Sequence, residues 1–206
     1  MKRGRLYVIS APSGAGKTSL VKQLLQTEPR LRLSISHTTR TRRPTEMEGR
    51  EYHFVSKPQF EELVARGEFL EHAQVFDNHY GTSRSFVESQ LAHGHDVLLE
   101  IDWQGAQQVR RAMPDCVSIF VLPPARQTLA ERLNRRATDT AEVISRRLKD
   151  AAGDMSHYGE FDYVVVNDDF ERAVADLKRV IDGKGGDLKS GRPELKPLLK
   201  DLLAQA

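Results

Sequence analysis

Residues 10–18 read SAPSGAGKT, a short run whose residue types and order suit the binding of phosphate. The glycines allow the backbone to curl so that successive N–H groups point toward one anion. Lys17 supplies a point charge, and the Thr18 hydroxyl is an oxygen ligand of the kind that Mg²⁺ prefers. The run ends as the phosphate-loop pattern G-x-x-x-x-G-K-[ST] does, with Ala11 at the first glycine position. The sequence therefore predicts a nucleotide phosphate site at Ala11, Pro12, Ser13, Gly14, Ala15, Gly16, Lys17 and Thr18.

A second anion site is indicated by residues 36–43, SHTTRTRR, where hydroxyl and cationic side chains crowd together. The planar guanidinium of an arginine matches the oxygens of a phosphate in a two-pronged contact. Taken alone, this segment is also compatible with a solvated basic loop. Paired with the phosphate loop, it favours an enzyme that holds two phosphorylated molecules.

Glu71, in the run FLEHA at 69–73, is a candidate for recognition of a purine base. A buried carboxylate accepts hydrogen bonds from the N1–H and the exocyclic amine of guanine. Adenine presents an unprotonated N1 at that place and would be repelled. Because a mismatch leaves buried polar groups unpaired, such a site can discriminate by ~10⁴ or more. Considered by itself, Glu71 is more readily interpreted as an ordinary surface glutamate.

The elements that must position these residues follow an alternating pattern. Four apolar runs rich in valine and isoleucine are expected to be buried parallel strands, at 6–10, 97–101, 117–122 and 163–166. Helical spacing of apolar residues lies between them, as at Leu20, Val21, Leu24 and Leu25. This alternation predicts an α/β fold with a parallel sheet of the P-loop NTPase type, flanked by helices.

Departures from this rhythm divide the chain. Residues 1–36, 97–125 and 159–182 are expected to form the core, and residues 37–96 a small α+β insertion with its own pocket. The arginine-rich stretch 126–158 is expected to be a helical lid. Residues 183–206 are expected to be a flexible glycine-containing link followed by a C-terminal amphipathic helix. The leucines of this helix are compatible with a homo-oligomer.

The bulk composition sets limits on partners and compartment. The 206 residues carry a net charge of only +2, with 39% hydrophobic and 29% charged residues, which is ordinary for a globular protein and does not indicate nucleic-acid or membrane binding. No stretch approaches the ~20 apolar residues of a membrane span. With one cysteine there is no intrachain disulfide, and a cytoplasmic location is expected. No cluster of metal-ligating residues has the spacing of a tightly bound metal.

From about Leu6 to about Asp182, the chain resembles the guanylate kinase family. The resemblance rests on separated motifs: SAPSGAGKT at 10–18, SHTTR at 36–40 with Arg43, GREYHFV at 49–55, FLEHA at 69–73, HYGTS at 79–83, EIDWQGAQQVR at 100–110 and VVVNDD at 164–169. It implies a nucleoside monophosphate kinase that transfers the γ-phosphoryl group of ATP, bound with Mg²⁺, to GMP or dGMP. The activity would serve purine nucleotide metabolism and the recycling of GMP.

The resemblance also implies roles for individual residues. The GMP phosphate would contact Arg40, Arg43, Tyr52 and Tyr80; the guanine would lie near Ser36, Glu71 and Thr82; Glu100 and Asp102 would complete the GMP site. Asn167 would lie near the adenine of ATP. The catalytic charges would be Lys17, Arg40, Arg132, Arg136 and Arg147. The family commonly has aspartate where this chain has Glu100, which is one methylene longer.

Two other readings of the sequence differ in their consequences. Guanylate-kinase-like domains of scaffolding proteins bind partners without catalysis, but they typically lack an intact phosphate loop, which is present here. A P-loop kinase for another small phosphorylated acceptor is the other alternative. A comparison of nucleoside monophosphates as acceptors separates these readings.

Overall fold

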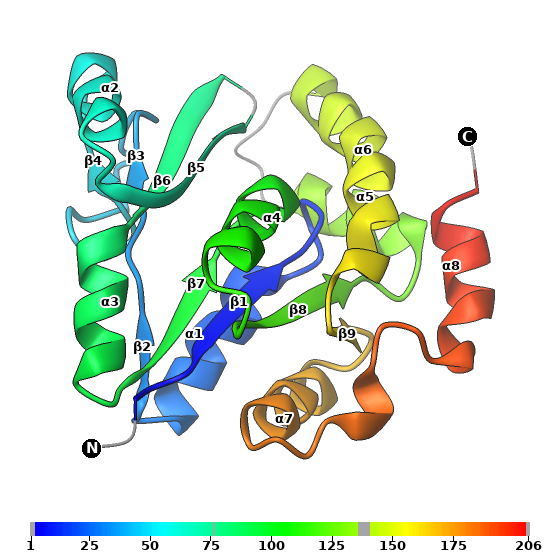
Figure 1. Cartoon of the computed structure of the whole chain (residues 1–206). Helices are drawn as coiled ribbons and strands as arrows, with labels where there is room; N and C mark the ends of the chain where they lie inside the picture. The colour runs from blue at the N-terminus through cyan, green and yellow to red at the C-terminus, as the bar shows by residue number, and fades with distance from the viewer. Residues whose placement is uncertain (1–2, 76, 136–140, 205–206) are drawn as a thin grey trace. The chain divides into compact units, whose positions relative to one another are not determined.

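The computed structural model describes residues 3–75, 77–135 and 141–204, with the side chains of residue 135 and of residues 141–147 excepted. The chain forms two compact units (Figure 1). The first unit comprises Met1–Val8 and Pro29–Val117, and the second comprises Ile9–Glu28 and Ser118–Ala206. Strand β1 (Leu6–Ser10) belongs to both units, because the boundary falls within it.

The larger sheet has five strands in the order β2-β7-β1-β8-β9. Strands β1, β8 (Val117–Leu122) and β9 (Tyr163–Val166) have the predicted bounds, and β7 (Asp96–Glu100) begins one residue earlier than expected. The pairs β2–β7 and β8–β9 are parallel. The expected α/β fold with a parallel sheet is thus confirmed. The fifth strand, β2 (Leu31–Leu33), was not predicted, because three residues around an exposed Arg32 are too few for an apolar signal.

The first unit also holds a sheet of four short strands in the order β4-β3-β6-β5. These strands span His37–Thr38 (β3), His53–Phe54 (β4), Phe69–Val75 (β5) and Asn78–Ser83 (β6). Helix α2 (Lys57–Ala65) begins at Ser56, whose side chain and that of Gln59 form a capping box. Helix α3 (Arg84–Ala92) packs against β5 and β7, and α4 (Trp103–Ala112) packs against β5. This small α+β assembly lies within the predicted insertion 37–96, apart from α4.

Four long helices belong to the second unit: α1 (Lys17–Thr27), α5 (Arg126–Arg135), α6 (Ala141–Ser156) and α7 (Phe170–Ile181). Helix α1 buries Leu20, Val21 and Leu24, three of the four residues of its predicted apolar stripe. It packs against α7, and Lys178 forms an ion pair with Glu28 at 3.1 Å. Helix α7 also packs against β9. These contacts anchor the helix that starts at the phosphate loop.

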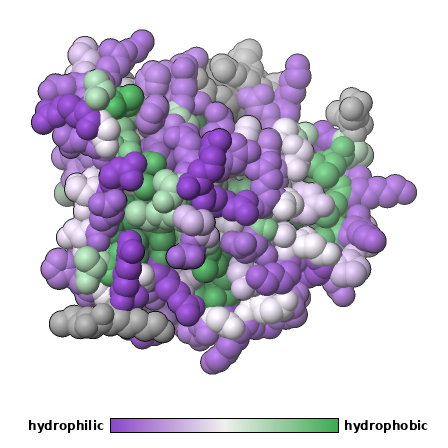
Figure 2. All heavy atoms as spheres, viewed as in Figure 1, coloured by the Kyte–Doolittle hydropathy of each residue, from purple (hydrophilic) through white to green (hydrophobic). Residues whose placement is uncertain are grey.

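The C-terminal segment contains two short 3₁₀ turns, Gly186–Leu188 and Pro193–Leu195, followed by α8 (Lys196–Leu202). Helix α8 buries Leu199 and Leu202. The expected link lies along β9: the Arg192 guanidinium donates to the carbonyl oxygens of Val164 at 2.7 Å and Leu188 at 2.8 Å. Figure 2 shows apolar side chains gathered at the edge that Figure 1 labels α8.

The lengths and hydropathies of the helices show whether any of them could span a membrane. Within the described residues, every helix is too short or too polar to cross a bilayer.

Candidate active site

The phosphate loop joins β1 to α1 within the second unit. Gly14 and Gly16 have φ angles of 89° and 92°, in the left-handed region that favours glycine. Gly16 is the N-cap of α1, so the helix begins at Lys17, directly after the loop. A helix N-terminus carries backbone N–H groups and a positive dipole end, which together attract anions. The loop therefore has the local geometry that its sequence predicts.

Neighbouring side chains also lie close to both glycines. A methyl group at Gly16 would lie 2.5 Å from the side-chain nitrogen of Asn167. At Gly14 it would lie 3.2 Å from Leu133 and 3.4 Å from Leu129, two buried residues of α5. The loop thus lies close against α5 and the end of β9, so a side chain at either glycine would require its neighbours to shift.

The carbonyl oxygen of Ala15 is the point at which three segments of the second unit meet. It accepts a hydrogen bond from Asn167 Nδ2 at 2.7 Å and another from Arg132 Nη1 at 3.1 Å. Arg132 Nη2 also donates to the carbonyl of Asn167 at 3.0 Å. Asn167 is only 4% exposed, so this network fixes the loop conformation in a place that water reaches poorly.

The residues expected to read guanine lie side by side in the small sheet of the first unit. Strand pairing places Glu71 opposite Thr82, and His37 opposite Gly81. Extended by one residue, the second register puts Ser36 opposite Thr82. Residues directly opposite one another point to the same face of a sheet. Thr82 and Glu71 therefore lie in a row on β6 and β5, which Ser36, the residue directly before β3, extends on the other side of β6.

This row is buried and polar. Thr82 is fully buried, Glu71 is 3% exposed and Ser36 is 8% exposed. The Thr82 hydroxyl donates to Glu71 Oε1 at 2.5 Å, which fixes the direction of the carboxylate. A buried carboxylate held in this way matches the two donors of a guanine edge.

Among the residues expected to contact the acceptor phosphate, Tyr80 lies in β6, whereas Arg40, Arg43 and Tyr52 lie in the loop between β3 and β4. Tyr80 pairs with Thr38 two residues from Thr82, a spacing of about 7 Å along a strand. The rings of Tyr80 and Tyr52 are 5.8 Å apart, and the Arg40 guanidinium lies 5.3 Å from the Tyr52 ring centre. Burial, together with the charge of Glu100, raises the pKa of Tyr52 to about 12. Tyr52 consequently keeps its hydroxyl proton at neutral pH and remains a hydrogen-bond donor.

Glu100 is the last residue of β7, and Asp102 directly precedes α4. The side chain of Asp102 caps α4 by accepting a hydrogen bond from the N–H of Gly105 at 2.9 Å. Sequence reasoning gave Asp102 a ligand role alone and missed this capping role, although an aspartate directly before a helical segment is a recognisable N-cap signal.

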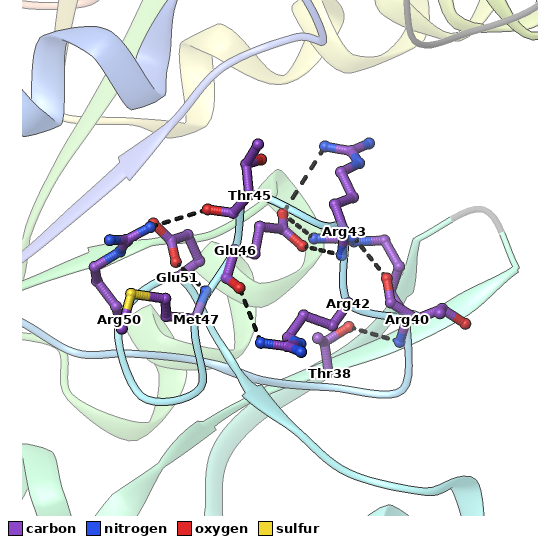
Figure 3. Close-up of polar contacts among 10 residues, drawn as sticks. Thr38, Arg40, Arg42, Arg43, Thr45, Glu46, Met47, Arg50 and Glu51 are labelled. Carbon is purple, nitrogen blue, oxygen red and sulfur yellow. Dashed lines mark hydrogen bonds and ion pairs between the residues drawn. The ribbon is translucent and has the colours of Figure 1, made fainter.

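Glu46 was also missed by sequence reasoning. Its carboxylate binds the Arg40 guanidinium at 2.6 Å and accepts from the N–H of Arg43 at 2.8 Å (Figure 3). Arg43 itself is 48% exposed, with its guanidinium 4.0 Å from the same carboxylate. A glutamate in a loop rich in arginine was available as a signal, but only the folded loop shows which arginine it meets.

A family model described as guanylate kinase matches residues 3–184 of the chain. This chain belongs to the guanylate kinase family. The match confirms the resemblance that the motifs indicate between Leu6 and Asp182.

Individual guanylate kinases are similar over nearly the whole chain. The guanylate kinase of Alkalilimnicola ehrlichii is 56% identical over 200 residues, covering 97% of this chain and 98% of that protein. That of Methylococcus capsulatus is 53% identical over 203 residues, covering 98% and 100%. The crystal structure of guanylate kinase from Anaplasma phagocytophilum matches with a TM-score of 0.74 and 35% identity, covering 97% of this chain and 95% of that one.

In this member of the guanylate kinase family, the predicted site residues fall into two groups. The first unit brings together the predicted GMP residues, and the second brings together the phosphate loop, Arg132 and Asn167. Arg136 lies outside the described residues, as does the side chain of Arg147, although residue 147 is within α6. In the described part of the chain, no cluster of three His, Cys, Asp or Glu residues is arranged to hold a metal ion.

Gly105 is a further residue of this guanylate kinase that lies beside the row of Ser36, Thr82 and Glu71. Helix α4 is fastened along β5, because the Gln108 side chain donates to His72 O at 2.8 Å and accepts from His72 N at 3.2 Å. This places Gly105, one turn earlier on α4, against Glu71. A Cβ at Gly105 would collide with the Glu71 carboxylate.

Gly105→Ala is therefore expected to displace Glu71 and to raise KM for GMP about tenfold, while the unfolding free energy falls by about 1–3 kcal/mol from overpacking. Steady-state kinetics and urea denaturation would measure both effects. Gly153→Ala is the matched control, since Gly153 is an exposed glycine of α6 with open space around it. That change is expected to stabilise the protein by about 0.5–1 kcal/mol and to leave KM for GMP unchanged. Equal kinetics in the two variants would show that Gly105 has no bearing on GMP binding.

Proposed function

We propose that this chain is an ATP:GMP phosphotransferase, which moves the γ-phosphoryl group of ATP reversibly to GMP and yields ADP and GDP. The observation that carries the proposal is identity of 56% with a guanylate kinase along 97% of the chain. The complete run Gly16-Lys17-Thr18, in a loop with two left-handed glycines, supports catalysis over a scaffolding role. Purine nucleotide metabolism, including recycling of GMP, is the corresponding place in the cell.

The predicted site residues divide the work of the reaction. The phosphate loop, with Asn167 near the adenine, would hold ATP. The acceptor GMP would be held by Ser36, Glu71 and Thr82 at its base and by Arg40, Arg43, Tyr52 and Tyr80 at its phosphate. Glu100 and Asp102 would line the same acceptor site. The geometry that supports this is the row of Ser36, Thr82 and Glu71, together with the neighbouring group of Arg40, Tyr52 and Tyr80.

The chemistry needs positioning and charge more than covalent help. Phosphoryl transfer passes through a loose transition state in which negative charge spreads over the equatorial oxygens. Lys17, Arg132, Arg136 and Arg147 would neutralise that charge. A GMP phosphate oxygen is already an anion, so no general base is required. Excluding water during transfer would prevent wasteful hydrolysis, which is the role proposed for the lid at 126–158.

Magnesium is proposed as the metal that accompanies ATP. The Thr18 hydroxyl fits it, because Thr18 lies in the first turn of α1 beside the phosphate loop and offers the oxygen that Mg²⁺ prefers. When bound, Mg²⁺ would draw charge from the phosphate oxygens. The rest of the site is supplied by the chain itself.

The domain division and the setting in the cell are proposals of the same kind. Residues 1–36, 97–125 and 159–182 would act as the core, 37–96 as the GMP-binding insertion, and 183–206 as a link with a terminal helix. We propose a cytoplasmic location for the protein. We propose dGMP as a second acceptor. Self-association through α8 is a further option. Nucleic acids and membranes are not among the proposed partners.

A coupled assay of ADP formation with GMP, dGMP, AMP, UMP and CMP tests the proposal. We expect turnover with GMP, and kcat/KM for AMP lower by ~10⁴ because adenine leaves buried polar groups unpaired. Equal use of all acceptors would favour a kinase of other specificity. Absence of turnover, with calorimetry showing that ATP does not bind, would favour the scaffolding alternative.

A further inference from the structure

The loop between β3 and β4 is folded around three glutamates, each of which accepts a hydrogen bond from a backbone N–H. Glu46 accepts from Arg43 at 2.8 Å, Glu51 from Met47 at 2.7 Å and Glu48 from Phe54 at 2.9 Å. Figure 3 shows the first two, with Glu46 pointing toward the arginines and Glu51 toward Arg50. The three carboxylates therefore share a local folding role, and they differ in the side chain that each one binds.

Glu46 differs from the other two because it holds Arg40. Arg40 Nη2 lies 2.6 Å from Glu46 Oε1, and Arg40 Nη1 donates to the carbonyl of Thr41 at 2.9 Å. The guanidinium also lies over the rings of Tyr52 and Phe54, at 5.3 Å and 5.9 Å. The side chains of Arg40 and Glu46 are only 17% and 11% exposed. Arg40 is thus held on several sides by other groups of the chain.

The fixed guanidinium keeps donors for an anion. An arginine side chain carries five N–H groups, and the contacts with Glu46 and Thr41 use two of them. A long side chain that is already ordered loses less entropy when it binds a ligand. Arg40 is therefore ordered and has N–H groups left for a phosphate group, although the negative charge of Glu46 lies close by.

Glu46 is ionised at neutral pH. Burial alone would raise the pKa of the Glu46 carboxyl, but the hydrogen bonds from Arg40 and from the N–H of Arg43 hold that pKa below its usual range. The same partner raises the pKa of Arg40 against the effect of its burial. The two groups form a stable ion pair at the edge of the acceptor site.

We propose that Glu46 is a positioning residue for the acceptor nucleotide, which acts by holding the Arg40 guanidinium in the orientation that meets the GMP phosphate. The proposal rests on the assignment of Arg40 to that phosphate. Two effects oppose each other here. The negative charge of Glu46 repels the phosphate, whereas the ordering of Arg40 favours its binding. The short, part-buried ion pair between Glu46 and Arg40 makes the ordering the larger effect.

Glu46→Gln tests this balance directly. The amide keeps the size of the side chain but loses the charge that secures Arg40. We expect KM for GMP to rise about tenfold, with KM for ATP unchanged and kcat within about threefold of the original value. The affinity for guanosine, measured as inhibition, should stay the same, because guanosine has no phosphate to meet Arg40. A fall in KM for GMP would mean that Glu46 competes with the phosphate, and the proposal would be wrong.

Glu51→Gln is the matched control. It also removes a carboxylate that accepts a backbone N–H in this loop, but its partner is the outward Arg50 at 2.6 Å. We expect its KM for GMP to stay within about twofold, as is usual for exposed ion pairs. If both variants raise KM for GMP equally, or if guanosine binding also weakens in Glu46→Gln, the role of Glu46 is merely to fold the loop and the proposal fails.

A double-mutant cycle with Arg40→Ala identifies the route of action. If Glu46 acts through Arg40, Glu46→Gln should cause no further rise in KM for GMP in the Arg40→Ala background. A full tenfold further rise there would refute action through Arg40 alone, leaving the proposed reaction intact. Normal KM for GMP in Arg40→Ala itself would instead overturn the assignment of Arg40 to the acceptor phosphate, and the Glu46 proposal with it.

Discussion

Glu71→Gln is expected to lower kcat/KM for GMP about a hundredfold, because a buried donor then faces the donors of guanine. Glu71 is 3% exposed, so water cannot easily satisfy the groups left unpaired. Its Oε1 also accepts from the Thr82 hydroxyl, which limits how the substituted amide can turn. The same amide can pair with adenine, which offers an acceptor at N1 and a donor at its exocyclic amine. The preference for GMP over AMP should therefore narrow.

Steady-state kinetics with GMP and AMP as acceptors would measure this change. Glu62→Gln is a suitable control, since Glu62 is an exposed glutamate of α2 paired with Arg66. Its kinetics should stay within about twofold of the original values. If Glu71→Gln retains full selectivity for GMP, guanine is not read by Glu71, and the base must lie elsewhere.

Lys17→Met is expected to lower kcat by roughly a hundredfold to a thousandfold, the usual loss when one preorganised charge is removed from a transition state. Lys17 is the first residue of α1 and directly follows Gly16 in the phosphate loop. Methionine has a similar length and a good helix propensity, so α1 should remain folded. Circular dichroism and thermal unfolding should be unchanged.

The matched control for this variant is Lys22→Met, which removes a lysine from an exposed position of the same helix. It should leave kcat within about twofold. Near-normal turnover in Lys17→Met would contradict the proposed role of Lys17 in stabilising the transferred phosphoryl group.

The parts of the fold that could be predicted are those whose signal is local. Strands β1, β8 and β9 were predicted because each is a nearly continuous apolar run, as is typical of a strand covered on both faces. Strand β2 has three residues and one of them is exposed. Strand β6, NHYGTS, is mostly polar and its apolar pattern is weak. Both depend on pairing with a neighbour, which no short stretch of sequence reveals.

The candidate site divides in the same way. The phosphate loop was predicted because its glycines, lysine and threonine are adjacent in the chain and act through their own backbone. Gly105 and Glu46 were not predicted as site residues, because their residue types alone do not indicate a role in the site. Their importance comes from what lies beside them, which for Gly105 is the Glu71 carboxylate and for Glu46 the Arg40 guanidinium.

The amino-acid sequence by itself determined the residue types of a two-nucleotide enzyme, the loop that binds one set of phosphates and the alternation of strands and helices. The tertiary structure alone decided which distant residues meet. Strand register, set by pairing across the small sheet, aligns Glu71 with Thr82 and His37, the neighbour of Ser36, with Gly81. The Ala15 carbonyl accepts hydrogen bonds from Arg132 and Asn167, which lie far from Ala15 along the chain. Local sequence specifies backbone preference and side-chain chemistry, whereas these meetings depend on packing that the whole chain must satisfy at once.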